Sequence, residues 1–254
     1  MQNYIIPIQK TLSDPAGTMV WFDLDDTLWD MYGNSIICLR ELYFSQRLDR
    51  WFATPEEWDE VYHRINTELW TQYSRAEISR DFLRTERFAR PLRIGGATEE
   101  EALAMSVSLD KLYLDTLGRQ TALIEGARGL LDDLSAKGYR MGIVSNGFKE
   151  VQYNKLRSSD IEKYFDVVVL SDEIGINKPD RRFFDYAVDK ASTQHLNNII
   201  IGDNYSTDIQ GGLGAGWKAI WFTNSSDLGD KTADDVITAK SLPEIAKLFE
   251  EQTK

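Results

Sequence analysis

The chain has 254 residues, of which 42% are hydrophobic and 28% charged, the balance of a folded globular protein rather than a disordered one. Its 29 basic and 41 acidic residues give a net charge of −12, which argues against a protein that binds nucleic-acid polymers or anionic membranes by bulk electrostatics. One cysteine and two histidines exclude an intramolecular disulfide, a cysteine-clustered metal site and a histidine-rich zinc site. Any bound metal should therefore be a hard cation with oxygen ligands.

Neither a membrane span nor a secretion signal is expected. The longest uninterrupted apolar run has four residues, far fewer than a membrane-spanning helix needs. The first twenty residues contain Lys10 and Asp14 and no apolar stretch that could serve as a signal peptide. We therefore expect a cytoplasmic protein with no membrane partner, present as a monomer or small homo-oligomer.

Five short segments are predicted to form buried strands. Each is rich in β-branched or aromatic residues and is apolar throughout rather than alternating, which is typical of parallel strands covered on both faces. In chain order they are Met19–Asp23, Arg140–Ser145, Asp166–Ser171, Asn198–Asp203 and Trp217–Phe222.

Helical patterns separate these strands. Gly129–Lys137 places three leucines at helical spacing, and Asp180–Ala191 places Phe183, Phe184 and Ala187 on one face. The alternation of strands and helices predicts right-handed βαβ crossovers. The expected fold class is therefore α/β, with a doubly wound, Rossmann-like parallel sheet.

A long segment interrupts this alternation after the first strand. Residues 31–118 are far too many for a βα loop, which has about 2–6 residues. Within the segment, Thr54 and Thr98 each stand three residues before a glutamate, which is the spacing of a helix capping box. We therefore predict two domains: an α/β core of residues 1–30 and 119–254, and an inserted all-helical domain of residues 31–118.

Polar and acidic stretches follow the predicted strands. Ligands of open α/β sheets bind beyond the carboxyl ends of the strands, so these stretches should meet at one edge. Aspartates packed so closely would raise one another's pKa values unless a cation intervened, which predicts a Mg²⁺ site suited to phosphate chemistry. The stretches are FDLDDT at 22–27, VSNG at 144–147, NKPD at 177–180 and GDNYSTD at 202–208.

These four motifs, in this order, resemble those of the haloacid dehalogenase superfamily of phosphohydrolases. The resemblance implies that Asp23 is the nucleophile, which forms an aspartyl-phosphate, and a ligand of Mg²⁺. Asp25 would protonate the leaving oxygen and then activate water, and its backbone carbonyl would also ligate the metal. Asp203 would be a further direct ligand, and Asp208 would hold a metal-bound water or Lys178.

The same resemblance implies a phosphate-binding set. Ser145 and Lys178 would bind the transferring phosphoryl oxygens, and Asn146 belongs to this set. Thr27 is included as well, and would also support the turn after the nucleophile. Asp25 separates a phosphatase from a dehalogenase, because haloalkanoic acid dehalogenases of this superfamily lack an acid at that position.

A narrower resemblance concerns the substrate. Leu69-Trp70-Thr71-Gln72-Tyr73 with Ile78, and Ser145-Asn146-Gly147-Phe148 followed by Val151-Gln152 and Leu156, resemble the pyrimidine 5′-nucleotidase-like subfamily. This resemblance implies that the helical domain is a cap and that the substrate is a small phosphorylated metabolite, with a nucleoside 5′-monophosphate as first candidate. Trp70 and Tyr73 are the side chains expected to stack on a base.

Other functions stay open. The same chemistry could act on a sugar phosphate or phosphoglycolate, or could serve a phosphomutase. A phospho-aspartate signalling module resembling a receiver domain also uses clustered aspartates, a hydroxyl and a lysine around Mg²⁺. The length of the chain, the inserted helical segment and the placement of Asp25 argue against such a module.

Six arginines of the helical segment form a predicted positive stripe. We expect them to be a solvated face paired with Glu77, Asp81 and Glu86, and the alternative is a local attractor for an anionic substrate. They are Arg75, Arg80, Arg84, Arg87, Arg90 and Arg93.

Overall fold

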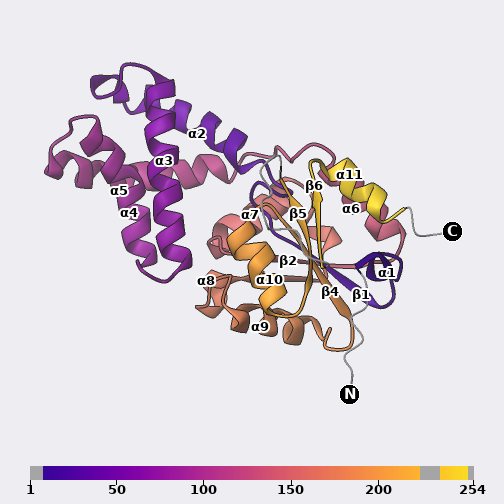
Figure 1. Cartoon of the computed structure of the whole chain (residues 1–254). Helices are drawn as coiled ribbons and strands as arrows, with labels where there is room; N and C mark the ends of the chain where they lie inside the picture. The colour runs from indigo at the N-terminus through magenta and orange to yellow at the C-terminus, as the bar shows by residue number, and fades with distance from the viewer. Residues whose placement is uncertain (1–7, 224–234, 251–254) are drawn as a thin grey trace. The chain divides into compact units, whose positions relative to one another are not determined.

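The computed structural model describes residues 8–223 and 235–250 (Figure 1). The chain divides into two compact units. One comprises Met1–Asp30 and Ala122–Lys254, and the other is the continuous segment Met31–Thr121. Each unit is described by itself below.

The first unit contains a parallel sheet with strand order β3-β2-β1-β4-β5-β6. This order confirms the predicted Rossmann-like α/β fold. The sixth strand was not predicted, because it is only four residues long and three of them are partly exposed at the edge of the sheet. The strands are β1 (Thr18–Phe22), β2 (Arg140–Ser145), β3 (Val167–Leu170), β4 (Asn197–Gly202), β5 (Lys218–Phe222) and β6 (Val236–Ala239).

Helices cover both faces of this sheet. Helices α9 and α10 lie on one side, and α6 and α11, which pack against each other, lie on the opposite side (Figure 1). The helices are α1 (Ile8–Leu12), α6 (Ala127–Ala136), α7 (Lys149–Ser158), α8 (Ser171–Ile174), α9 (Arg181–Ala191), α10 (Gln210–Gly214) and α11 (Leu242–Leu248). Three further single turns are the 3₁₀ turn Glu162–Tyr164, the π-helical turn Tyr205–Ile209 and, in the second unit, the 3₁₀ turn Leu48–Arg50.

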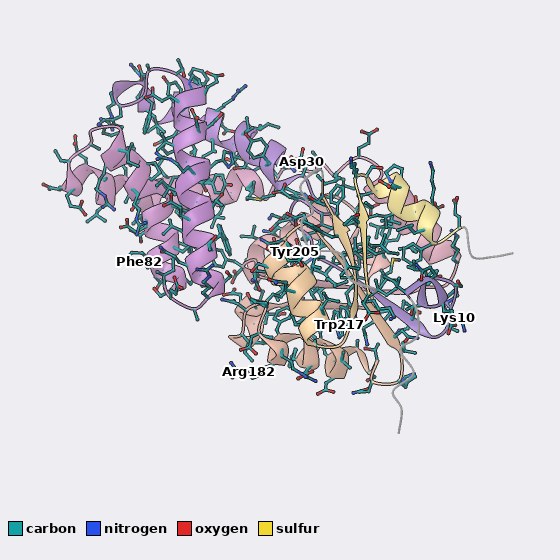
Figure 2. The ribbon with its side chains drawn as sticks, in the orientation of Figure 1. Lys10, Asp30, Phe82, Arg182, Tyr205 and Trp217 are labelled. Atoms are coloured by element: carbon teal, nitrogen blue, oxygen red, sulfur yellow. The ribbon has the colours of Figure 1, made fainter. Side chains whose placement is uncertain are left out.

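Aromatic packing builds the core on the α9 and α10 side. Trp217, labelled in Figure 2, stacks on Trp21 of β1 with ring centroids 5.3 Å apart, and Phe184 of α9 meets it edge to face at 5.0 Å. Trp21 and Phe184 are fully buried. Aromatic burial of this kind is a large stabilising term, so this layer holds the sheet rigid beneath its carboxyl edge.

The second unit is all helical. Its helices are α2 (Met31–Ser45), α3 (Pro55–Ser74), α4 (Arg80–Ile94) and α5 (Glu99–Leu117). Thr98 and Glu101 form the full predicted capping box at the start of α5. At α3, Thr54 accepts a hydrogen bond from the backbone of Glu57 at 3.1 Å, but the Glu57 carboxylate accepts one from Ala53 rather than from Thr54. Both predicted helix starts are therefore found, but only one of the two predicted capping boxes is complete.

The arginines of α4 form only part of the predicted solvated face. Arg87 is buried and shares the carboxylate of Asp110, on α5, with Arg84. Arg84 Nε donates to Asp110 Oδ2 at 2.8 Å, and Arg87 Nε donates to Asp110 Oδ1 at 2.9 Å. Arg90 does pair with Glu86, at 3.1 Å, as expected. The prediction failed for Arg87 because its partner lies on a different helix, which helical spacing within α4 could not reveal.

Within the described residues, we find no helix with both the length and the apolar character of a membrane span.

Candidate active site

The carboxyl ends of β1, β2 and β4 are neighbours, as the strand register shows. Phe22, the last residue of β1, is paired with Ile143 of β2 and with Ile201 of β4. The next residue, Asp23, continues this pairing, because its backbone N–H donates to the Ile201 carbonyl at 2.9 Å. The polar residues that follow β1, β2 and β4 therefore emerge side by side.

A tight turn follows Asp23. Asp26 adopts a left-handed backbone conformation (φ 56°), and its N–H donates to the Trp29 carbonyl at 2.8 Å. The Leu24 carbonyl accepts hydrogen bonds from the backbone of Leu28 and Trp29, at 3.0 and 2.9 Å. These bonds fix the backbone of Asp25 at the rim of the sheet.

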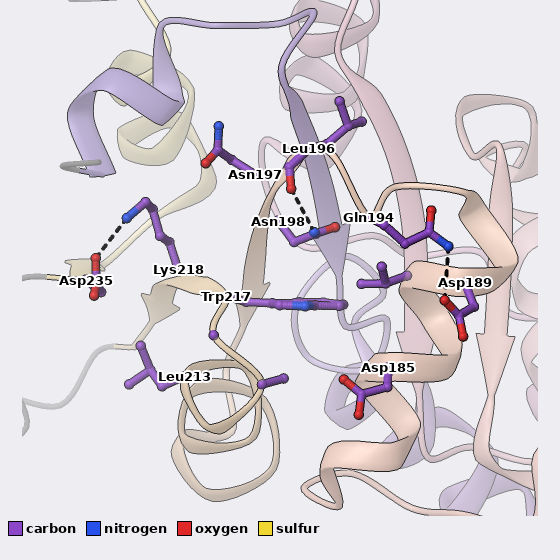
Figure 3. Close-up of a pocket in the computed structure, with 13 residues that line it drawn as sticks. Asp185, Asp189, Gln194, Leu196, Asn197, Asn198, Leu213, Trp217, Lys218 and Asp235 are labelled. Carbon is purple, nitrogen blue, oxygen red and sulfur yellow. Dashed lines mark hydrogen bonds and ion pairs between the residues drawn. The ribbon is translucent and has the colours of Figure 1, made fainter. Parts of the chain in front are cut away.

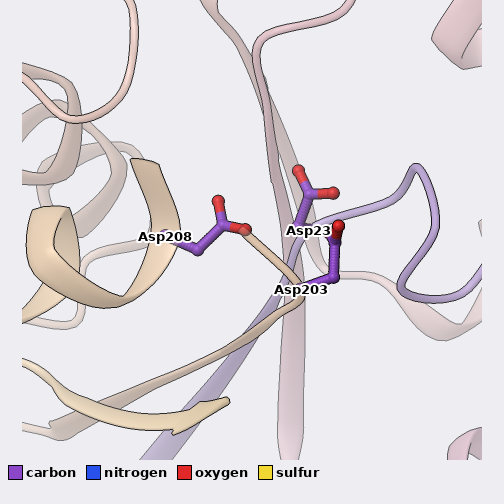
Figure 4. A group of neighbouring side chains, drawn as sticks. All are labelled: Asp23, Asp203 and Asp208. Atoms are coloured by element: carbon purple, nitrogen blue, oxygen red, sulfur yellow. The ribbon is translucent and has the colours of Figure 1, made fainter. Parts of the chain in front are cut away.

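Three carboxylates converge at this edge. Asp23, Asp203 and Asp208 each place an oxygen within 4.8 Å of the others (Figure 4). Asp208 fits because Gly202, at the end of β4, has no side chain: a Cβ there would lie 2.4 Å from an Asp208 carboxylate oxygen. The structure thus brings together three of the acidic residues that the sequence placed at this edge.

One buried lysine joins this group. The ammonium of Lys178 donates to Asp23 Oδ1 at 2.7 Å, to Asp208 Oδ1 at 2.6 Å and to the Val144 carbonyl at 2.8 Å. Burial alone would lower the pKa of Lys178, but the charges of Asp208 and Asp23 more than offset this and raise it. Lys178 is therefore a fixed cation between two of the three acids.

The acids still outnumber the positive charge. The pKa of Asp23 is raised to about 7, chiefly by burial; Lys178 opposes the shift, and the charges of Asp208 and Asp25 add to it. Burial also raises the pKa of Asp203, and the negative charges of Asp23 and Asp208 add to it. Three carboxylates with one ammonium leave an excess of two negative charges, so the charge and the oxygen donors fit a divalent hard cation.

Two residues of the predicted phosphate-binding set tie the loops of the site together. Thr27 is fully buried; its hydroxyl donates to Asp203 Oδ1 and accepts from the Asp203 backbone, both at 3.1 Å. Asn146 donates to the Lys178 carbonyl at 3.0 Å and accepts from the Lys178 N–H at 2.8 Å. The Thr27 proton is therefore directed at a carboxylate rather than at a phosphate, which departs from the predicted role.

Asp25 and Ser145 lie beside α7. The sequence motifs predict the contacts between this helix and Asp25 only in part. Gln152 and Lys155 both donate hydrogen bonds to the Asp25 carboxylate. The sequence motifs include Gln152 only within a family resemblance and do not include Lys155. The available signal was their spacing: residues three apart on a helix share a face, and this helix directly follows the second motif.

Trp70 and Tyr73 lie on α3 in the helical unit. Their rings meet edge to face with centroids 5.5 Å apart. Their expected stacking on a base stays a prediction.

A cavity of about 830 Å³ lies at the opposite, amino-terminal edge of the sheet (Figure 3). Its polar groups already have partners: Lys218 is paired with Asp235 at 2.9 Å, and Gln194 donates to Asp189 at 3.0 Å. Its carboxylates do not converge as those of the other edge do, so the carboxyl edge is the candidate active site.

Comparison with known proteins identifies the family of the chain. The model of the haloacid dehalogenase-like hydrolase family matches residues 20–222. The HAD-hydrolase YfnB of Bacillus subtilis is 30% identical over 79% of this chain and 81% of its own. The pyrimidine 5′-nucleotidase YjjG of Escherichia coli is 27% identical over 91% and 96%, and the glyceraldehyde 3-phosphate phosphatase of Methanothermobacter thermautotrophicus is 29% identical over 85% and 89%.

A solved structure shares the architecture. The crystal structure of YfnB bound to magnesium superposes with a TM-score of 0.79 at 26% identity, covering 92% of this chain and 98% of that one. The family match spans the ordered motifs and the carboxyl edge that carries them. The chain therefore belongs to the haloacid dehalogenase-like hydrolase family.

Proposed function

We propose that this protein is a Mg²⁺-dependent phosphomonoesterase that works through an aspartyl-phosphate on Asp23. The observation that carries the proposal is the pairing of buried Asp23 with Lys178 at 2.7 Å, beside Asp203 and Asp208. A fixed ammonium next to a carboxylate attracts a phosphoryl group and stabilises charge that develops on it.

The reaction has two balanced steps. In the first, a carboxylate oxygen of Asp23 bonds to phosphorus, the P–O bond to the leaving group breaks, and Asp25 gives its proton to the leaving oxygen. In the second, Asp25 takes a proton from water, the water oxygen bonds to phosphorus, and the bond to Asp23 breaks. Inorganic phosphate leaves, and both carboxyl groups return to their starting states.

Other side chains of the site bind rather than react. Lys178 and the hydroxyl of Ser145 would hold the non-bridging phosphoryl oxygens. Asp23, Asp203 and the backbone carbonyl of Asp25 would hold Mg²⁺, with Asp208 supporting Lys178 or a metal-bound water. When bound, Mg²⁺ supplies charge neutralisation that lets an anionic ester approach three carboxylates.

A nucleoside 5′-monophosphate is the proposed substrate. The relative YjjG, which matches over nearly the whole chain, is named as a pyrimidine 5′-nucleotidase. The second candidate is a sugar or triose phosphate, supported by the similarity to a glyceraldehyde 3-phosphate phosphatase. If Trp70 and Tyr73 stack on a base, replacing Trp70 with alanine will raise KM for nucleotides and leave p-nitrophenyl phosphate hydrolysis unchanged.

Asp25 favours a hydrolase over a signalling receiver or a dehalogenase. Its side chain is about 30% exposed, two residues beyond the nucleophile, where it can reach a leaving group. A halide leaving group needs no proton, and a long-lived phospho-aspartate needs no group that activates water.

Phosphate release from a panel of nucleoside monophosphates and sugar phosphates tests the proposal. We expect turnover with Mg²⁺, no turnover with EDTA, and the highest kcat/KM with a pyrimidine nucleotide. Turnover that EDTA does not reduce would refute the metal dependence. A phosphorylated protein without turnover would favour a receiver, and an isomerised sugar phosphate would identify a mutase.

A further inference from the structure

The face of α7 toward Asp25 carries two buried polar side chains. Lys155 Nζ donates to Asp25 Oδ1 at 2.5 Å, and Gln152 Nε2 donates to Asp25 Oδ2 at 3.0 Å. Both carboxylate oxygens of Asp25 are therefore held from one helix. Gln152 is fully buried, and the side chain of Lys155 is only 3% exposed.

The position of Lys155 is tightly defined. Its ammonium lies 4.6 Å from the centroid of the Trp29 ring, and the indole N–H of Trp29 donates to Ser159 Oγ at 3.0 Å. A buried ammonium is costly unless it is paired, and Lys155 is paired with Asp25. Lys155 thus joins the acid/base residue to a rigid part of the α/β unit.

Gln152 links Asp25 to the phosphate-binding motif. The same Nε2 atom donates to Ser145 Oγ at 2.7 Å, and this oxygen also accepts from the Gly147 N–H at 3.1 Å. A hydroxyl has two lone pairs and one proton, so Ser145 has filled its acceptor sites and keeps its O–H for an acceptor elsewhere. A phosphoryl oxygen is such an acceptor.

The backbone leaves space for this arrangement. A Cβ on Gly147 would lie 2.3 Å from Gln152 Nε2, so a side chain there would displace the amide. The orientation of the amide follows from its two contacts, because the nitrogen carries one N–H for Asp25 Oδ2 and another for Ser145 Oγ. The second motif therefore includes a glycine whose lack of a side chain admits Gln152.

We propose that Gln152 and Lys155 are positioning residues that aim the carboxyl of Asp25 at the leaving group and the hydroxyl of Ser145 at the phosphoryl group. This inference rests on the proposed phosphatase function. Each oxygen of Asp25 accepts one bond from α7 and retains a second lone pair, so a proton can still move on and off it. Neither positioning residue itself touches the substrate.

Leaving-group dependence distinguishes this role from a structural one. p-Nitrophenolate is a stable anion and leaves with little help from an acid, whereas an alkoxide must be protonated as it leaves. We expect Lys155→Met and Gln152→Leu to lower kcat/KM for an alkyl phosphate about 100-fold, with KM nearly unchanged. Lys155→Met should lower kcat/KM for p-nitrophenyl phosphate less than about fivefold. Gln152→Leu also frees the Ser145 hydroxyl, so it should lower this value further, but still less than for the alkyl phosphate.

Matched variants control the experiment. Arg157→Met removes a cation from the exposed side of the same helix and should change neither substrate's kcat/KM. Lys155→Arg keeps a charged donor and should recover part of the alkyl phosphate activity. Thermal unfolding shows which variants are folded, and Lys155→Arg remains informative if Lys155→Met does not fold.

Two failures can be told apart. If the wild-type protein shows no Mg²⁺-dependent turnover of either ester, the proposed function is wrong. If the wild type turns over but Lys155→Met and Gln152→Leu lower both esters by the same factor, or match Arg157→Met, the positioning role is wrong.

Discussion

Both units of the molecule bury charged side chains, but basic groups outnumber the acid in one and acids outnumber the basic group in the other. In the helical unit, one carboxylate, Asp110, is shared by Arg84 and Arg87. At the edge of the sheet, one ammonium, Lys178, is shared by Asp23 and Asp208, with Asp203 close by. Arginine forks satisfy the acid in the first case, whereas three acids share a single cation in the second.

The Asp110 cluster is suited to stabilising the fold, whereas the acids of the sheet edge are suited to binding a ligand. A buried acid that two guanidinium groups satisfy holds helices together and has no demand for a ligand. The acids at the sheet edge have raised pKa values because burial and mutual repulsion oppose their ionisation. Such a site gains stability only when a cation binds, which is why charge imbalance marks the candidate active site.

The largest expected effect is on activity, at the acidic cluster of the sheet edge. Asp23→Asn should lower phosphatase kcat at least about 10⁴-fold, because it removes the proposed nucleophile. Without metal, the variant should unfold at the same or a higher temperature than wild type, because one of three like charges is removed. Asp160→Asn, on an exposed residue, is the matched control for activity and unfolding. A marked loss of thermal stability in Asp23→Asn would contradict the comparison.

A substitution at the Asp110 cluster of the helical unit should instead lower stability and leave activity unchanged. Arg87→Met leaves Asp110 with one partner in a buried setting, and should lower the free energy of unfolding by about 3–5 kcal/mol. Denaturant unfolding measures this loss. Below its unfolding temperature the variant should keep wild-type kcat/KM for p-nitrophenyl phosphate; a change of under about 1 kcal/mol in stability would show that the buried pair is not structural.

A pH effect of intermediate size follows from the pKa of Asp23. Its raised value, about 7, means that below this pH the metal-free folded protein holds a proton that the unfolded chain releases near pH 4. Stability of the metal-free protein should therefore fall as pH rises from about 4 to 7.

On the proposed function, Mg²⁺ displaces this proton when it binds. Its apparent affinity should weaken up to about tenfold per pH unit as pH falls below about 7. The Mg²⁺-induced rise in unfolding temperature, titrated on either side of that pH, measures this effect. Equal affinities on both sides would contradict the raised pKa.

The smallest expected effect is a stability loss at Arg84, the more exposed partner of Asp110. Arg84 shares Asp110 with Arg87, but its side chain is 34% exposed against 4% for Arg87. Arg84→Met should therefore cost about 1 kcal/mol or less, since solvent screens an exposed pair. Equal losses for Arg84→Met and Arg87→Met would show that burial does not set the energy of these pairs.

The sequence predicted the core of the fold because apolar strands covered on both faces have a distinctive pattern. Five of the six strands in the described residues were located to within one residue at each end. The edge strand Val236–Ala239 was missed because it is short and half exposed. The α1 helix, Ile8–Leu12, was also missed, since five residues are too few for a periodic pattern.

The sequence also indicated which residues meet at the sheet edge, because strand ends in a parallel sheet lie together. It could not reveal contacts made from the sides of helices. Lys155 belongs to none of the four motifs, and its role depends on the direction of α7 relative to Asp25. The partner of Arg87 lies on another helix, 23 residues away, and only the tertiary structure identifies it.

The most direct test of the account is a rapid-quench experiment with a phosphate ester labelled on phosphorus, followed by mapping of any label on the protein. The account predicts that label appears on Asp23 as the alcohol is released, and leaves it as inorganic phosphate forms. Release of alcohol and phosphate together, with no label on Asp23 and with turnover retained in Asp23→Asn, would contradict it.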